Sequence, residues 1–267
     1  MPEQAAPRLV ATDLDGTLLD DHGQVSPRTR EVLGELDRRG IPVVFVTGRP
    51  IRWMESLWSD VGGHGLAICS NGGIVYDVPG HAVRNALTIE PEVVLAAAQR
   101  LRRRIPGTSF ALEKTGGFAR EPGYQPRVRQ PLEIPIGSLP EIVDSTVVKV
   151  LARHDDIAPE PFWGQVEEAI GDLVTTTWSS VDALVEMSAR GVTKATTLER
   201  IVAELGVLPG EVVAFGDMPN DIPMLRWAGH SYAMANAHPS ARAAARGVAP
   251  ANTDDGVASV LTGLFGL

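Results

Sequence analysis

The sequence of 267 residues predicts an α/β fold, in which a doubly wound, Rossmann-like parallel sheet is interrupted by an inserted α+β domain. Three observations lead to this prediction. Near-continuous apolar runs, typical of strands buried on both faces, alternate with helical stripes at both ends of the chain. These runs end in small or polar residues, as expected at the ligand-binding edge of such a sheet. Between them, from residue 83 to 188, the pattern changes to that of an antiparallel sheet with helices.

The first 82 residues predict strands that alternate with helices. An apolar strand at 9–12 precedes a helix that Ser26 caps and Pro27 opens, because serine accepts a main-chain N–H and proline fits the first helical position. The other elements expected in this part are a strand at 41–46, a helix through 53–58, a strand at 65–69 and a short strand at 74–76. This βαβαβ order predicts parallel pairing, with the carboxyl ends of the strands at one edge of the sheet.

Residues 83–188 predict an inserted α+β domain with an antiparallel sheet. Apolar residues at helical spacing indicate a helix from 91 to 104, whose basic last turn suits the negative end of the helix dipole. A stretch rich in glycine and proline, 115–126, is expected to form turns. The remaining elements expected here are a strand at 146–152, a helix at 161–170 and strands at 173–178 and 183–187.

The α/β pattern resumes at residue 189 and continues to 267. The elements expected there are a helix at 195–205, a strand at 211–215, a helix opened by Pro223, a strand at 231–234, a helix at 240–246, a strand at 247–249 and a C-terminal helix. The outer segments 1–82 and 189–267 therefore predict one core domain, into which the segment 83–188 is inserted.

The composition excludes some classes of partner. A formal net charge of −9 and a pI near 5.2 argue against general nucleic-acid binding, which favours a clustered basic surface. Cys69 is the one cysteine and lies in an apolar run, so we expect a buried thiol in a reducing compartment. Because no apolar stretch approaches ~18 residues, we expect a cytoplasmic protein that does not bind membranes. The sequence does not indicate an oligomeric state.

Acidic residues follow two of the predicted strands. Asp13 and Asp15 come after the first strand, and strand alternation would put both on one face. Asp217 and Asp221 follow the strand at 211–215 and could face the first pair. Carboxylates gathered at one point need a cation, and Mg²⁺ is a hard ion that accepts such ligands. For the first pair alone, a turn formed by the Asp-Gly step is the alternative explanation.

The same strand ends carry groups suited to a phosphate. Lys194 supplies a cation, Thr47 a hydroxyl and the main chain near Gly48 N–H donors, which together with a metal would neutralise a dianion. Asp13 could then attack phosphorus as a carboxylate nucleophile and form an aspartyl-phosphate. Asp15 could protonate the leaving oxygen and later deprotonate the attacking water. Because an aspartate is normally ionised near neutral pH, this acid role needs surroundings that hold the proton.

Four short segments, taken in order, resemble the motifs of the haloacid dehalogenase (HAD) superfamily. They are Asp-Leu-Asp-Gly-Thr at 13–17, Val-Thr-Gly-Arg at 46–49, Lys194, and Gly-Asp-Met-Pro-Asn-Asp at 216–221. The insertion between the second and third motifs, and the phrase at 220–225, resemble the Cof-type phosphatases with a large α/β cap. The likeness covers essentially the whole core, whereas the inserted domain resembles the family in placement and size only.

This resemblance implies a Mg²⁺-dependent phosphoric monoester hydrolase that acts on a small phosphorylated metabolite, such as a sugar phosphate. It implies that Asp13 is both nucleophile and metal ligand, and that Asp15 is the acid/base whose main-chain carbonyl also binds the metal. Asp217 would ligate the metal, and Asp221 would support it, directly or through water. The inserted domain would select the substrate.

The resemblance also implies which residues hold the substrate. Thr47 and Lys194 would bind the phosphate, and Asn220 matches a position that often contacts the phosphoryl group. Asn71 matches a loop position that can touch substrate, although an asparagine in an Asn-Gly turn explains it equally well. Arg49 is expected to be an ion-pair partner and not a substrate ligand.

Two other functions share these motifs. A phosphomutase would form the same aspartyl-phosphate and return the phosphoryl group to a sugar phosphate, so the core motifs do not exclude it. A non-catalytic sugar-phosphate sensor would have no need of both Asp13 and Asp15, and the intact acid set argues against that alternative.

Overall fold

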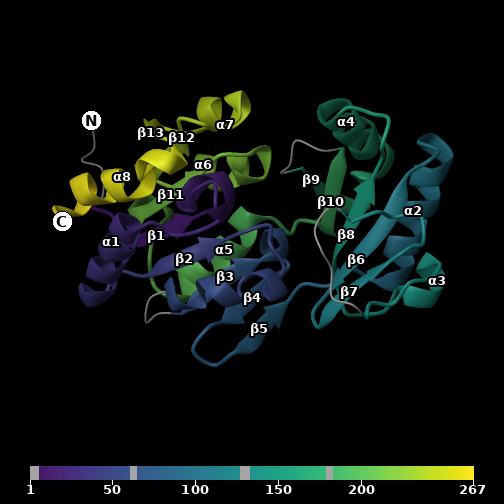
Figure 1. The fold of residues 1–267 in the computed structure, drawn as a ribbon, viewed down its shortest axis with the longest axis horizontal. Coiled ribbons are helices and arrows are strands. Elements are labelled where there is room, and N and C mark those ends of the chain that lie inside the picture. Colours follow the sequence, from purple (N-terminus) through teal and green to yellow (C-terminus); the bar gives the residue numbers. More distant parts are fainter. Residues whose placement is uncertain (1–5, 61–64, 127–132, 179–182) are drawn as a thin grey trace. The chain divides into compact units, whose positions relative to one another are not determined.

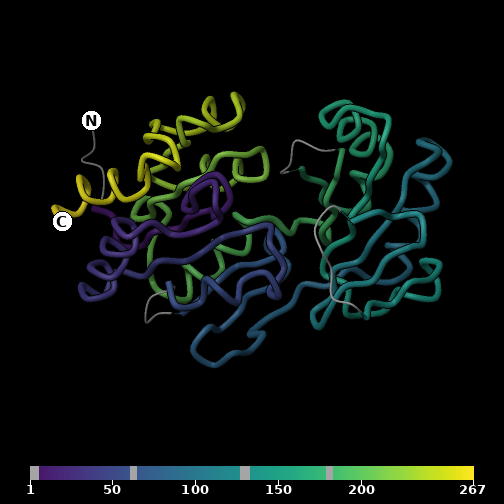
Figure 2. Tube along the Cα trace, in the orientation of Figure 1, coloured from purple at the N-terminus to yellow at the C-terminus, as the bar shows by residue number. Residues whose placement is uncertain are grey.

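The computed structural model of the chain describes residues 6–60, 65–126, 133–178 and 183–267. The chain divides into two compact units, one made of Met1–Arg84 with Lys194–Leu267 and the other of Asn85–Thr193. The chain therefore passes from the first unit to the second once and returns once, which can be followed in Figure 2.

The first unit is built on an eight-stranded sheet in the order β13-β12-β11-β1-β2-β3-β4-β5 (Figure 1). The strands are β1 (Leu9–Thr12), β2 (Val43–Val46), β3 (Leu66–Cys69), β4 (Ile74–Asp77), β5 (Ala82–Ala86), β11 (Val212–Gly216), β12 (His230–Met234) and β13 (Gly247–Ala249). From β13 to β3 the pairs are parallel, and β4 pairs with β3 in the antiparallel sense. Every residue of β1, β2 and β11 is buried. Because successive side chains point to opposite faces, both faces of the sheet centre are covered.

Helices of the first unit follow its strands in the predicted alternation. They are α1 (Pro27–Arg38), α5 (Lys194–Glu204), α6 (Ile222–Trp227), α7 (Pro239–Ala244) and α8 (Gly256–Phe265). The predicted start of α1 is confirmed, since Ser26 Oγ accepts the N–H of Thr29 at 3.0 Å and Pro27 is the first helical residue. Helix α1 packs against α8, and α5 packs against α6 (Figure 1).

The second unit contains a five-stranded antiparallel sheet in the order β7-β6-β8-β10-β9. Its elements are α2 (Pro91–Arg104), β6 (Ser109–Lys114), β7 (Gly117–Arg120), α3 (Leu139–Ile142), β8 (Val147–Arg153), α4 (Pro159–Ile170), β9 (Val174–Thr177) and β10 (Leu184–Ala189). One face of the sheet, with Phe110 and Val185, forms a core with Leu101 of α2 and Phe162 of α4. The predicted α/β core with an inserted α+β segment is therefore confirmed as a fold class.

Two local predictions differ from the structure. The expected helix through 53–58 is a pair of short 3₁₀ turns, Ile51–Trp53 and Glu55–Asp60, which bury Leu57 and Trp58 at their end. The stretch 115–126, which was expected to form turns, contains the strand β7. Pairing with β6 makes a strand of these four residues. Within the described parts of the chain, no helix has the length and apolar character needed to cross a membrane.

Candidate active site

The site begins where the central strands of the first unit end. Asp13 directly follows β1, and its N–H donates to the carbonyl of Phe215 in β11 at 3.0 Å. Parallel pairing between the two strands thus extends to the residue that carries the carboxylate. Asp13 is 5% exposed, so its carboxylate has little access to bulk water.

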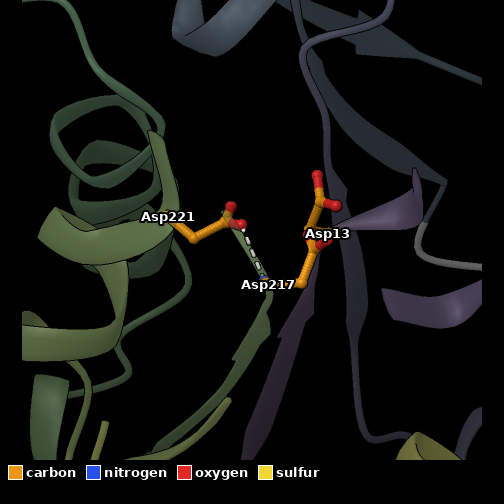
Figure 3. A group of neighbouring side chains, drawn as sticks. All are labelled: Asp13, Asp217 and Asp221. Atoms are coloured by element: carbon orange, nitrogen blue, oxygen red, sulfur yellow. Dashed lines mark hydrogen bonds between the residues drawn. The ribbon is translucent and has the colours of Figure 1, made fainter. Parts of the chain in front are cut away.

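A tight loop after β11 brings two further carboxylates to the same edge. Asp217 follows the last residue of β11, and Asp221 closes the loop by accepting the N–H groups of Asp217 and Met218, each at 3.0 Å. Gly216 is required here, since a Cβ atom on it would lie 2.5 Å from Cβ of Asp221. The loop therefore fixes the Asp221 carboxylate toward the strand end, as Figure 3 shows.

The carboxylates of Asp13, Asp217 and Asp221 form one buried cluster, in which one oxygen from each lies within 4.8 Å of the others. Lys194, at the start of α5, enters this acidic triad and donates to Asp13 Oδ1 at 2.5 Å and to Asp221 Oδ1 at 2.7 Å. Thr17 Oγ1 donates to Asp217 Oδ1 at 3.3 Å. The sequence thus predicted correctly that Asp217 and Asp221 lie near Asp13.

The acidic triad carries more negative charge than Lys194 neutralises. Burial raises the pKa of Asp13 well above its usual range, although Lys194 opposes this shift. Burial also raises the pKa of Asp217 to about 7, with the Asp221 charge adding to the effect. For Lys194, burial alone would lower the pKa, but attraction to Asp13 and Asp221 outweighs it and the pKa is raised. Three oxygen donors with excess negative charge fit a hard divalent cation such as Mg²⁺.

Asp15 lies apart from the acidic triad. The strand ends at Thr12, and the turn that follows contains Gly16 with φ of 72°, so strand alternation does not extend to Asp15. Its side chain is 60% exposed and pairs with Arg49, with Nε to Oδ2 at 2.8 Å and Nη2 to Oδ1 at 2.5 Å. The ion-pair role expected for Arg49 is therefore present, and its partner is the candidate acid/base.

The residues expected to hold the phosphate lie on the neighbouring strand ends. Thr47 follows β2 and is fully buried, and its Oγ1 accepts the N–H of Arg49 at 3.0 Å. Asn220 Nδ2 donates to Asn71 Oδ1 at 3.1 Å, which joins the loops after β11 and β3. A Cβ atom on Gly48 would lie 3.0 Å from Asn71 Oδ1, so a side chain there would press on this asparagine pair.

The loop after β3 carries backbone strain. Ser70 and Asn71 both have positive φ, 52° and 56°, which residues other than glycine rarely adopt. The buried Ser70 Oγ and Asn220 Oδ1 have no hydrogen-bond partner in the described structure. Strained backbone and unsatisfied buried polar atoms are features that collect at functional sites.

Comparison with known proteins identifies the family. A sequence model of the haloacid dehalogenase-like hydrolases matches residues 10–261. The chain belongs to this family. The predicted membership and hydrolase class are thereby confirmed.

Individual proteins resemble the chain along nearly its whole length. Pyridoxal phosphate phosphatase YbhA of Escherichia coli is 31% identical, with 95% of this chain and 97% of that protein covered. The 5-amino-6-(5-phospho-D-ribitylamino)uracil phosphatase YcsE of Bacillus subtilis is 27% identical over 95% of this chain and 94% of its own length. The crystal structure of SMU.1108c from Streptococcus mutans matches with a TM-score of 0.85 and 22% identity, and covers 98% of this chain and 100% of that one. This last likeness shows that the fold is shared.

One residue near the HAD motifs was not found by reasoning from the sequence. Asn236 Nδ2 donates to the carbonyl of Gly16 at 2.8 Å and so ties the turn that carries Asp15 to the loop after β12. Nothing in its sequence surroundings indicates this role, because the two residues are 220 positions apart.

Proposed function

We propose that this HAD-family hydrolase is a Mg²⁺-dependent phosphatase that removes phosphate from a small phosphorylated metabolite through an aspartyl-phosphate intermediate. The observation that carries the proposal is the buried Asp13 carboxylate at the end of β1, with Lys194 2.5 Å away and Asp217 and Asp221 in the same cluster. Named relatives that cover nearly the whole chain are phosphatases of phosphorylated cofactors and precursors, which supports the same substrate class here.

The acidic triad is the proposed metal site. Asp13, Asp217 and Asp221 would hold Mg²⁺, and the family resemblance adds the main-chain carbonyl of Asp15. When bound, the ion would neutralise the carboxylates and stabilise the charge that develops on the phosphoryl oxygens. The raised pKa values of Asp13 and Asp217 support this assignment, because they express an uncompensated cost of keeping both groups ionised.

In the first step, a carboxylate oxygen of Asp13 forms a bond to phosphorus while the bond from phosphorus to the substrate oxygen breaks. The departing oxygen takes the proton of Asp15 and leaves as an alcohol. Lys194 holds Asp13 in place through the 2.5 Å hydrogen bond and supplies positive charge beside the reacting group. Asp13 would be left as a mixed anhydride with phosphate.

In the second step, a water molecule attacks the phosphorus of this anhydride. Asp15, now a carboxylate, takes one proton from the water, and the bond from phosphorus to the Asp13 oxygen breaks. Inorganic phosphate leaves, Asp13 is again a carboxylate and Asp15 again carries a proton. One water is consumed for each phosphate released, and no other co-reactant is required.

The remaining phosphate contacts are assigned to the neighbouring strand ends. Thr47 would donate through its hydroxyl, since its oxygen already accepts the Arg49 N–H and its own hydrogen is available to a ligand. The main chain at Gly48, the Lys194 ammonium group and the amides of Asn220 and Asn71 complete the proposed set. All five groups contain hydrogen-bond donors and Lys194 adds a positive charge, which suits the dianion of a phosphate monoester.

Selection of the substrate is assigned to the inserted segment 83–188, and the catalytic groups to 1–82 and 189–267. The acids of the triad and Lys194 all come from the two outer segments. A sugar phosphate or a similar small metabolite is the proposed substrate class.

The experiment is a phosphate-release screen over a panel of phosphorylated metabolites, with and without Mg²⁺, for the parent protein and Asp13→Asn. We expect Mg²⁺-dependent release that Asp13→Asn abolishes, and an acid-quenched parent protein that carries one phosphoryl group on the peptide containing Asp13. Asp21→Asn, which changes an exposed carboxylate of the same unit, is the matched control and keeps full activity. Retained turnover in Asp13→Asn would disprove the nucleophile assignment, and metal-independent turnover would disprove the proposed cofactor.

A further inference from the structure

The ion pair between Arg49 and Asp15 has the geometry of a two-point clamp. The guanidinium group uses two N–H groups, Nε at 2.8 Å and Nη2 at 2.5 Å, and each meets a different oxygen of the same carboxylate. Such parallel contacts fix the plane of a carboxyl group as well as its position. A lysine ammonium group is a point charge and cannot impose this orientation.

Asp15 depends on this clamp for its orientation. Its side chain is 60% exposed, and in the described structure Arg49 supplies the hydrogen bonds to its carboxylate. The turn around it contains the left-handed Gly16, so no regular strand or helix packing restricts the side chain. An exposed carboxyl group without a partner would sample several rotamers, and restricting it to one of them costs side-chain entropy.

The main chain of Arg49, in contrast, is held by hydrogen bonds at both its N–H and its carbonyl group. Its side chain is 20% exposed, against 60% for Asp15. Its N–H donates to Thr47 Oγ1 at 3.0 Å, and its carbonyl accepts the N–H of Ser70 at 2.9 Å. The same turn therefore positions both the candidate phosphate ligand Thr47 and the main chain from which the Arg49 side chain extends.

We infer that Arg49 is a positioning residue, which orients the Asp15 carboxyl group for its two proton transfers and does not itself bind phosphate. This inference rests on the proposed acid/base role of Asp15. The proton still passes from Asp15 to the leaving oxygen, and a proton from water returns to Asp15. Arg49 takes no part in that exchange and acts only through the orientation of the carboxyl group.

Leaving-group dependence tests the inference, because a good leaving group needs no proton and an alkyl alcohol does. For Arg49→Ala we expect single-turnover cleavage of an alkyl phosphate to slow by about 10- to 100-fold, the size of effect that misplacing a reacting group can produce. The p-nitrophenol burst from p-nitrophenyl phosphate should stay within about threefold of the parent rate, and KM should change little. Guanidinium ion added at low concentration should restore part of the alkyl phosphate rate.

Arg49→Lys and Arg49→Met provide the same readout should the alanine variant fold poorly. Both should slow cleavage of the alkyl phosphate much more than cleavage of p-nitrophenyl phosphate, a difference that we call the leaving-group split. The lysine variant should be less impaired, because it keeps the charge but loses the two-point contact. Arg30→Ala is the matched control, since Arg30 makes a similar two-point pair with Asp60 in the same unit. It should lower stability without any leaving-group split.

The outcomes separate this inference from the proposed function. Equal slowing for both leaving groups, or a large rise in KM, would show that Arg49 binds phosphate or only supports the fold, and would overturn the inference. Asp15→Ala is measured in parallel. If it shows the split and the Arg49 variants do not, the positioning role fails alone; if Asp15→Ala shows none, the acid/base assignment itself fails.

Discussion

Two buried lysines of this chain each have a carboxylate 2.5 Å away, and their surroundings differ. Lys149 of β8 pairs with Glu186 of β10, and the two are diagonal neighbours on adjacent antiparallel strands. Lys194 reaches Asp13 and Asp221, which come from separate segments beyond the strand ends. The register of the sheet accounts for the closeness of Lys149 and Glu186. It does not account for the closeness of Lys194 to Asp13 and Asp221.

The difference separates a charge cluster that a sheet positions from one that serves a ligand. In the second unit, Lys149 of the central strand β8 lies between two buried acids of the neighbouring strands, Glu186 of β10 and Glu113, which is opposite it on β6. In the first unit, one lysine meets a triad of carboxylates, and burial raises the pKa of Asp13 and of Asp217. Natural proteins keep such unfavourable local arrangements where function requires them. The two lysines should therefore respond differently to the same substitution.

The largest expected effect is on catalysis. Lys194→Met should lower kcat/KM for p-nitrophenyl phosphate by about 10³-fold, because it removes the positive charge and the hydrogen bond beside the nucleophile. Lys149→Met, the matched substitution in the other unit, should leave kcat/KM per folded molecule within about threefold. Steady-state kinetics at saturating Mg²⁺ measures both. Comparable losses in the two variants would contradict the distinction between the lysines.

The second effect is on stability and concerns the site of Lys149. Lys149→Met should lower the free energy of unfolding by about 3 kcal/mol, because the buried acids Glu186 and Glu113 lose the lysine that lies between them. The triple variant Lys149→Met with Glu113→Leu and Glu186→Leu should recover most of that loss, since it removes all three charges. Urea unfolding followed by circular dichroism gives these values. A triple variant as unstable as the single one would show that these three residues do more than satisfy their own charges.

The third effect concerns the metal and pH. The pKa of Asp217 is raised to about 7 in the folded protein, above its unfolded value, so the folded state binds the extra proton and metal-free stability should fall as pH rises from about 4 to 7. Mg²⁺ at 100 times its dissociation constant should add about 2.7 kcal/mol, with tighter binding at pH 8 than at pH 5.5 because the proton competes for the carboxylate.

Thermal unfolding with and without Mg²⁺ at the two pH values checks this prediction. Asp217→Asn should reduce the pH dependence, because an amide does not titrate, and should remove most of the Mg²⁺ effect, because a ligand is lost; the part of the pH dependence that comes from the raised pKa of Asp13 should remain. Glu186→Gln, in the charge pair of the other unit, should leave the Mg²⁺ effect unchanged. A stability that rises between pH 4 and 7 in the metal-free protein would contradict the assigned direction of the Asp217 shift.

The fold could be predicted largely because its signals are local. Pro91 and the basic last turn mark both ends of α2, and the helix spans the predicted residues. The apolar run at 41–46 contains β2, whose four residues are all buried. The structure has 3₁₀ turns near Trp58 where a helix was expected. Over so short a segment, apolar residues three or four positions apart fit a 3₁₀ turn as well as an α-helix.

The site could be predicted only in part, because its geometry depends on contacts between distant segments. The grouping of Asp13 with Asp217 and Asp221 followed from the rule that parallel strands end at one edge. The separation of Asp15 from that group did not, since it depends on the strand ending at Thr12 and giving way to a turn, so that strand alternation does not reach Asp15. Its clamp by Arg49 joins residues 34 positions apart and has no local signal.

The smallest expected effect concerns a neutral donor in the acidic triad. Thr17 Oγ1 lies 3.3 Å from Asp217 Oδ1, and this hydrogen bond lowers the Asp217 pKa against the larger effect of burial. Thr17→Val keeps the shape and removes the donor, so the midpoint of the pH dependence of Mg²⁺ binding should move upward by about 0.5 unit, equivalent to a weak hydrogen bond of about 0.7 kcal/mol. Calorimetric titration with Mg²⁺ across pH measures the midpoint, and Thr175→Val, on β9 of the other unit, is the control. A midpoint that does not move would show that Thr17 contributes nothing to the charge balance of the triad.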